Sequence, residues 1–166
     1  MKTTFKLNAI LPLAAMLITT AFAIPSTAHA TDLRIAGSLD TAEEHVVTPP
    51  TMTVELEGTG HASGLGRFVL ETHAVVFLPT FYGTGVFSID TGGGMLSGTL
   101  AGYGHPTPDV DAVPVEETFT ITGGTGRFLG ATGTINSKRI LSRSTGVSSG
   151  TIEGTITLPD RGRSGN

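Results

Sequence analysis

Hydrophobic and polar residues alternate with a period of two along most of the chain after residue 30, as they do in β-strands with one buried face. No stretch there repeats its apolar residues with the period of an amphipathic helix. Short alternating runs separated by glycine and proline predict eight strands, at residues 33–39, 52–57, 67–78, 82–89, 95–103, 115–122, 128–141 and 151–158. The chain is therefore predicted to be all-β, and eight strands are enough to close a barrel.

Prolines predict two long loops between these strands. Pro49 and Pro50 remove two backbone donors, so residues 40–51 are expected to form a loop. Three prolines predict a second loop at residues 104–114. The last stretch, residues 159–166, is rich in arginine, glycine and serine and is expected to be a disordered polar tail.

A glycine-rich segment joins the sixth and seventh predicted strands, with the sequence GGTGRFLGATG from Gly123 to Gly133. Glycine reaches the positive φ values that a tight turn needs, and Phe128 is expected to resume an extended chain, so the segment predicts a β-hairpin. Its structural residues are expected to be Gly123, Gly124, Gly126, Arg127, Phe128, Gly130 and Gly133. Nucleotide binding is not predicted, because the glycines lack both the following helix of a dinucleotide-binding fold and the Gly-Lys-Ser/Thr ending of a P-loop.

The run Gly-Gly-Thr-Gly-x-Phe-x-x-Ala-x-Gly at residues 123–133 resembles the glycine hairpin of the allene oxide cyclase and dirigent β-barrels, and most closely that of the bacterial allene oxide cyclase barrel-like family. A Gly-x-Gly-His-Ala-Ser turn that runs into Gly-Arg-Phe, at residues 58–68, resembles a second feature of that family. The resemblance implies a calycin-like, eight-stranded antiparallel up-and-down barrel over residues 31–158. It implies little about chemistry, because the pocket residues of plant cyclases and dirigent proteins have no position-by-position match here.

The first 30 residues have the pattern of a secretory signal peptide. Two lysines near the start precede an apolar run at residues 7–24, and Ala28 and Ala30 place small residues at both cleavage-determining positions. An uncleaved anchor is the alternative, since about 18 apolar residues can just span a bilayer, but Pro12 and the cleavage site disfavour it. The mature chain is therefore expected to begin at Thr31, to be secreted or periplasmic, and to have no membrane segment.

Charge and cysteine content narrow the function classes. The whole chain has a formal net charge of −4, and without the first 30 residues, which hold two lysines and no acidic residue, the charge is −6. Binding to nucleic acid is therefore not expected. The chain has no cysteine, so an exported barrel has to be stable without disulfides. His45, His61 and His105 lack metal-ligand spacing, no Gly-x-Ser-x-Gly elbow is present, and neither a metal nor a cofactor is expected.

Glu117 breaks the hydrophobic pattern of the sixth predicted strand. It has the same parity as Phe119 and Ile121, so its side chain is expected to point inward, across from Leu100 on one neighbouring strand and Gly133 on the other. A buried carboxylate is costly unless it is hydrogen-bonded, so Glu117 is the first candidate for a catalytic or binding group. The alternative is that Glu117 lies near the rim of the barrel, reached by water or by a donor from a loop.

Glu71 and His73 are less favoured candidates for catalysis. They lie two residues apart, so their side chains share one face of a strand. The hydrophobic parity of that strand favours a position outside the barrel, whereas pairing through a loop centred on Pro79 would place Glu71 near Phe87, inside. If both lie inside, they would form an acid/base group with Glu117.

These observations predict an exported β-barrel that binds or shields a small apolar molecule, and no residue pattern demonstrates catalysis. The expected ligand-binding residues are Phe87, Leu100, Glu117 and Phe119. One alternative is a cyclase or isomerase of the allene oxide cyclase type, or a dirigent-like protein that guides the cyclisation of a reactive intermediate. The sequence leaves open whether the chain is an enzyme. The other alternative is a packed structural or interaction barrel that would act as a surface module or a homo-oligomer.

Overall fold

A computed structural model describes residues 30–160, and residues 1–29 and 161–166 lie outside the described part. The expected signal peptide except Ala30, and most of the expected polar tail, fall on these residues. The described part contains β1 (Thr31–Thr48), β2 (Thr51–Ala62), β3 (Gly66–Phe77), β4 (Tyr82–Thr91), β5 (Gly94–Gly104), β6 (Ala112–Gly124), the 3-10 turn η1 (Gly126–Phe128), β7 (Thr132–Ser142) and β8 (Val147–Leu158). Within it, no helix has the length and apolar character needed to cross a membrane.

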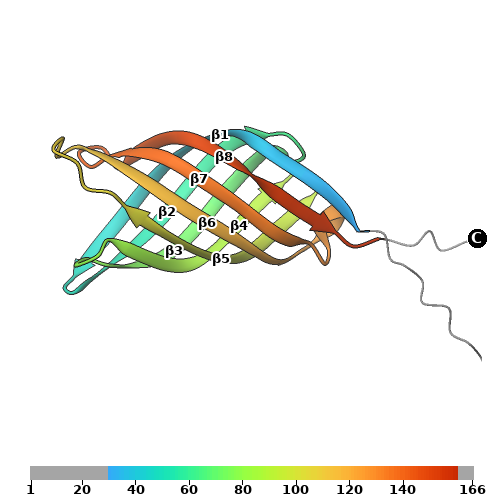
Figure 1. Cartoon of the computed structure of the whole chain (residues 1–166), viewed down its shortest axis with the longest axis horizontal. Helices are drawn as coiled ribbons and strands as arrows, with labels where there is room; N and C mark the ends of the chain where they lie inside the picture. Colours follow the sequence, from blue (N-terminus) through green and yellow to red (C-terminus); the bar gives the residue numbers. More distant parts are fainter. Residues whose placement is uncertain (1–29, 161–166) are drawn as a thin grey trace, which may run out of the picture.

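The strands form one closed sheet. Each strand pairs antiparallel with the next, and β8 pairs with β1, so the sheet closes into a barrel (Figure 1). The predicted all-β, eight-stranded antiparallel barrel is therefore confirmed. β1 begins and β8 ends at the same end of the barrel, where Thr31 lies opposite Leu158. The connections from β1 to β2, β3 to β4, β5 to β6 and β7 to β8 lie at the opposite end, which we call the loop end.

Alternation along each strand divides the side chains between the interior and the outer surface. On β2, Val54 and Leu56 are buried while Glu55 and Glu57 are exposed, as the sequence pattern predicts. The largest fully buried apolar side chains are Ile35, Leu39, Leu70, Leu96, Phe119, Phe128, Ile135 and Ile156. Most of them lie in the half of the barrel that contains the chain ends, and this half forms the hydrophobic core.

The predicted loop at residues 40–51 is wrong. β1 continues through Thr48, and only Pro49 and Pro50 form the turn into β2. A proline removes its own backbone donor but leaves the donors of the residues before it intact, so those residues still pair with β2. Because β1 is longer than predicted, Glu43 lies within the strand, and its side chain faces the interior of the barrel.

The second predicted loop is confirmed only over its central part. β5 ends at Gly104 and β6 begins at Ala112, so residues 105–111 form the connection instead of 104–114. β8 in turn begins at Val147, four residues before the predicted start at Thr151. Prolines and glycines therefore mark where strands end, but they do not fix the ends to the residue.

The glycine-rich connection between β6 and β7 is longer than a tight hairpin turn. Gly123 and Gly124 end β6, the next residues form η1, and β7 begins only at Thr132. Phe128 does not resume an extended chain as expected, because it lies in η1 with its side chain fully buried. The buried ring of Phe128 packs in the hydrophobic core at this end of the barrel.

Arg127 fixes this connection against a neighbouring loop. Its Nη2 donates a hydrogen bond to the carbonyl oxygen of Leu65 over 2.8 Å, and its guanidinium lies 4.5 Å from the ring centre of Phe128. Three glycines of the segment have positive φ, with values of 56°, 75° and 135° at Gly126, Gly130 and Gly133. The segment thus has the structural role that the sequence predicts, in a different conformation.

Candidate functional site

A cavity of about 370 Å³ lies inside the barrel at the loop end. Its wall is mostly apolar and includes Met52, Val54, Ala74, Val76, Leu100 and Leu141. Small residues occupy several inward positions here. Ala74, Gly83 and Gly102 line the cavity, whereas the inward positions of the same three strands in the core half carry Leu, Ile and Phe.

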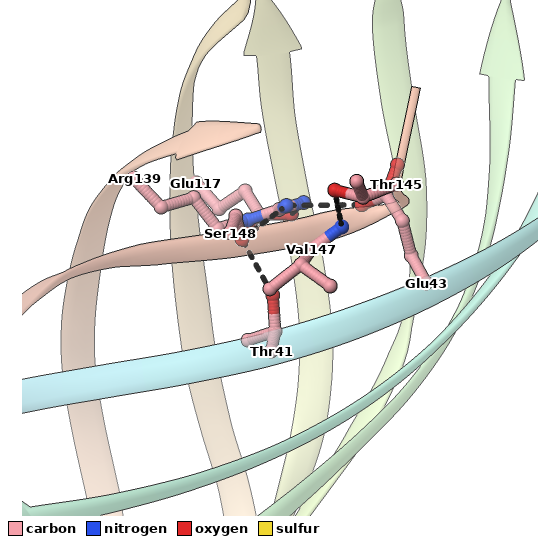
Figure 2. A network of polar contacts seen from close by, with 7 residues as sticks. All are labelled: Thr41, Glu43, Glu117, Arg139, Thr145, Val147 and Ser148. Atoms are coloured by element: carbon pink, nitrogen blue, oxygen red, sulfur yellow. Dashed lines mark hydrogen bonds and ion pairs between the residues drawn. The ribbon is translucent and has the colours of Figure 1, made fainter. Parts of the chain in front are cut away.

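Arg139 on β7 is the centre of a polar cluster in this cavity (Figure 2). Its Nε and Nη2 donate to Oε2 and Oε1 of Glu117 on β6, over 3.1 and 3.2 Å, which makes the pair bidentate. Its Nη1 donates to Oε2 of Glu43 on β1 over 2.9 Å and to Oγ of Ser148 on β8 over 3.1 Å. Ser148 also shares a hydrogen bond with Thr41, so the cluster connects four strands.

Arg139 keeps its charge although it is buried. The side chains of Arg139, Glu43 and Glu117 are only 4%, 6% and 12% exposed. Burial alone would lower the pKa of Arg139, but attraction and hydrogen bonding from Glu117, and then from Glu43, outweigh it and raise the pKa above its ordinary value. Arg139 therefore stays positively charged, with two carboxylates facing one cation.

The inward position expected for Glu117 is confirmed, but its register is wrong. Glu117 lies opposite Gly102 on β5 and Ser137 on β7, rather than opposite Leu100 and Gly133. The long connection between β6 and β7 displaces the partner on β7, and β5 pairs with β6 two residues away from the expected register. Arg139, a strand residue, donates to the carboxylate, in the place of the loop donor of the rim alternative.

The sequence pattern did not lead to the other two charged residues of the cluster, Arg139 and Glu43. Arg139 shares its parity on β7 with Ile135 and Leu141, so the rule that selected Glu117 would also have selected Arg139. Glu43 gave no such signal, because it fell within a predicted loop and had no assigned face. Such a cluster can be predicted where charged residues occupy inward positions on neighbouring strands.

The other expected ligand-binding residues divide between the cavity and the core. Leu100 lines the cavity together with Glu117. Phe87 and Phe119 are buried in the core and pack edge to face, with ring centres 5.1 Å apart and an interplanar angle of 75°. These two rings are not part of the cavity wall, and a role for the four residues in ligand binding stays a prediction.

Glu71 and His73 lie on the outer surface of β3, as the favoured interpretation expects. Glu71 is opposite Glu57 on β2, and Nδ1 of His73 lies 3.5 Å from Oε1 of Glu55. They are therefore separated from Glu117 by the barrel wall, and the alternative in which all three form an acid/base group is wrong. Within residues 30–160, no three His, Asp or Glu side chains lie close enough together to hold a metal ion.

Asp111 connects two loops at the mouth of the cavity. Its carboxylate accepts hydrogen bonds from the backbone N–H of Ser144 over 2.7 Å and from Oγ of Ser142 over 2.9 Å. Its carbonyl oxygen accepts from the N–H of Arg143. The backbone hydrogen bond from Ser144, followed by those of the Ser144 and Ser142 side chains, lowers the pKa of Asp111 below 3.8.

We expect this loop contact to weaken only in strong acid. Because the folded-state pKa of Asp111 lies below the unfolded value of 3.8, its stabilising contribution is present above that pH and is lost as the pH falls through the folded-state pKa. An NMR titration of the Asp111 carboxyl should give a midpoint below 3.8, with the Ser144 amide signal moving in parallel. A midpoint above 3.8, or a Ser144 signal that does not follow Asp111, would contradict the contact.

Comparison with known proteins identifies no relative. No family model, no curated protein and no solved structure matches the chain. The resemblance to the allene oxide cyclase barrel-like family therefore depends on the glycine-containing turns alone.

Proposed function

We propose that this barrel binds a small, largely apolar molecule in the cavity at its loop end. The observation that carries the proposal is the cavity itself, with a volume of about 370 Å³, an apolar wall and one buried group of charged side chains. Small-molecule sites are typically concave, apolar and supplied with a few polar groups that orient the ligand. The cavity has each of these properties.

The small inward residues at the loop end support binding over simple structural packing. Closely packed interiors leave few voids, and an unfilled void loses favourable contacts along its wall. Ala74 lines the cavity where a larger apolar residue would fill space, whereas an added Cβ at Gly83 or Gly102 would lie only 3.0 Å from Val76 or 2.5 Å from the carbonyl oxygen of Glu116. A barrel selected only for stability would place a larger residue at Ala74, so the cavity disfavours the packed structural barrel as the main function.

A second candidate is a cyclase or isomerase, or a dirigent-like protein, in which the cavity folds a reactive intermediate. The specific observation in its favour is that two carboxylates, Glu43 and Glu117, line an otherwise apolar cavity. Shape and one or two charged groups could then guide the reaction. The glycine-turn resemblance to the allene oxide cyclase barrel-like family agrees with this candidate, which stays second because a charged cluster in an apolar cavity is equally suited to binding without catalysis.

We further propose that the protein acts after export. The expected cleavage after Ala30 would leave Thr31 as the first residue, and β1 begins at Thr31. Cleavage there would therefore leave the barrel complete.

Filling the cavity tests the binding proposal. Ala74→Phe places a ring in the cavity and is expected to weaken the binding of n-octanol, measured by isothermal titration calorimetry, by about tenfold or more. The matched control is Val75→Phe, on the same strand with an outward side chain, which should leave the affinity unchanged. Ala74→Leu serves as a smaller change if the phenylalanine variant does not fold.

Native mass spectrometry of the purified protein adds a direct observation of a retained ligand. The expected result is an additional mass on the wild-type protein and on Val75→Phe that is absent from the Ala74 variants. Equal octanol affinity in all these proteins would overturn the proposal, because binding would then not depend on the cavity.

A further inference from the structure

Hydrogen-bond acceptors outnumber donors where Arg139 meets Glu43 and Glu117. Arg139 has five N–H groups, and four of them are used, two toward Glu117, one toward Glu43 and one toward Ser148. Each carboxylate offers about four lone-pair sites, yet among the described residues Glu117 accepts two hydrogen bonds and Glu43 accepts one. Oε1 of Glu43 accepts none of them. Among the described residues the cluster therefore has more acceptor sites than hydrogen bonds to fill them.

The net charge of the cluster also favours a ligand that brings hydrogen-bond donors. Two carboxylates share one guanidinium, so the buried group carries a formal charge of −1. Burying a net charge is costly unless an opposite charge is close by. Both Glu43 and Glu117 line the cavity, so a bound molecule can reach them. A ligand with a positive group would supply both the missing charge and the missing donors.

Three other titratable side chains, His45, Tyr103 and Arg143, line the cavity. All three are exposed, so solvent and salt screen their charges more strongly than they screen those of the buried cluster. Arg143 could instead hold an anionic head group at the mouth while the apolar body of the ligand enters the barrel. This arrangement competes with binding at the cluster and predicts the opposite preference for charge.

We propose that the molecule bound in the cavity is an amine with an apolar body, and that its protonated amino group donates hydrogen bonds to Glu43 and Glu117. This inference rests on the proposed function. An alkylammonium group has three donors and a charge of +1, which matches the acceptor surplus and the charge of the cluster. Side chains such as Met52, Val76 and Leu100 then contact the apolar body.

Three probes of equal chain length test the inference: n-octylamine, n-octanol and octanoate. At neutral pH the amine is protonated, since alkylammonium groups such as that of lysine have a pKa of about 10.4. Calorimetric titration of the purified protein is expected to show octylamine binding about tenfold more tightly than octanol, and octanoate more weakly than octanol. Octanol reports on the cavity, and the order of the three probes reports on the cluster.

Neutralising one carboxylate should remove the preference without closing the cavity. Glu43→Gln is expected to reduce the preference for octylamine over octanol to about threefold or less, with circular dichroism checking that the barrel stays folded. Glu44→Gln removes the neighbouring, outward carboxylate and should leave all three affinities as they are. Glu117→Gln provides a second variant of the cluster if Glu43→Gln does not fold.

Two outcomes overturn the inference and leave the proposed function intact. Equal affinities for octylamine and octanol would show that the cluster does not select a cation. Tighter binding of octanoate, lost in Arg143→Gln, would place the head group at the mouth. If none of the three probes binds, the proposed function fails together with the inference.

Discussion

Replacing Arg139 with methionine is expected to lower the free energy of unfolding by about 3–5 kcal/mol. Arg139 is buried and is the ion-pair partner of both Glu43 and Glu117. Methionine keeps much of the side-chain volume but removes the charge, which leaves two carboxylates in the interior without their main donor. Equilibrium unfolding in urea, followed by circular dichroism, measures the loss as a shift of the midpoint.

Neighbouring positions provide matched controls for this substitution. Lys138→Met changes an outward side chain that is 64% exposed and should stay within about 0.5 kcal/mol of the wild type. Ser137→Ala removes a buried hydroxyl that has no hydrogen-bond partner among the described residues, so it should be close to neutral. Adding Glu43→Leu and Glu117→Leu to Arg139→Met should recover much of the loss, because no buried charge remains. A loss below about 1 kcal/mol in the single variant would contradict this account.

The barrel could be predicted from the sequence because each strand shows its own signal. On β2, and on β8 from Thr151 onward, larger apolar residues alternate with polar ones, and the structure places the apolar set inside. The second half of β1 shows no such alternation, because acidic residues, a histidine and two adjacent valines precede the paired prolines. Residues 43–48 are nevertheless a strand because they pair with β2, and such a contact between segments is not visible in the local pattern.

The candidate site could be predicted only in part, for the same reason. Glu117 was found because a single charged residue interrupts the apolar parity of its own strand. Its connection to Arg139 and Glu43 depends on the registers of β6 with β7, β7 with β8 and β8 with β1, and a shift of one residue in any of them would move these side chains apart. A shift of this kind changes which residues face one another across the sheet, and no single strand reveals it.

The glycine-rich segment that identified the fold contains the second position where a large effect is expected. Gly133 has a φ of 135°, a region that side-chain-bearing L residues rarely adopt. A Cβ atom at this position would also overlap the carbonyl oxygen of Thr155 on β8, which is held in the β7–β8 pairing. Gly133→Ala is therefore expected to lower the free energy of unfolding by about 3 kcal/mol or more.

Two other glycines separate backbone strain from the steric overlap. Gly66 has a φ of 75° and no atom within 4 Å of an added Cβ, so Gly66→Ala should cost only the left-handed conformation, about 1–2 kcal/mol. Gly123 has neither a positive φ nor a close neighbour, and Gly123→Ala should remain within about 0.5 kcal/mol of the wild type. Urea unfolding of the three variants should give losses in the order Gly133, Gly66, Gly123. If Gly133→Ala were as stable as Gly123→Ala, the close approach of β7 and β8 at this glycine would not be required for the barrel.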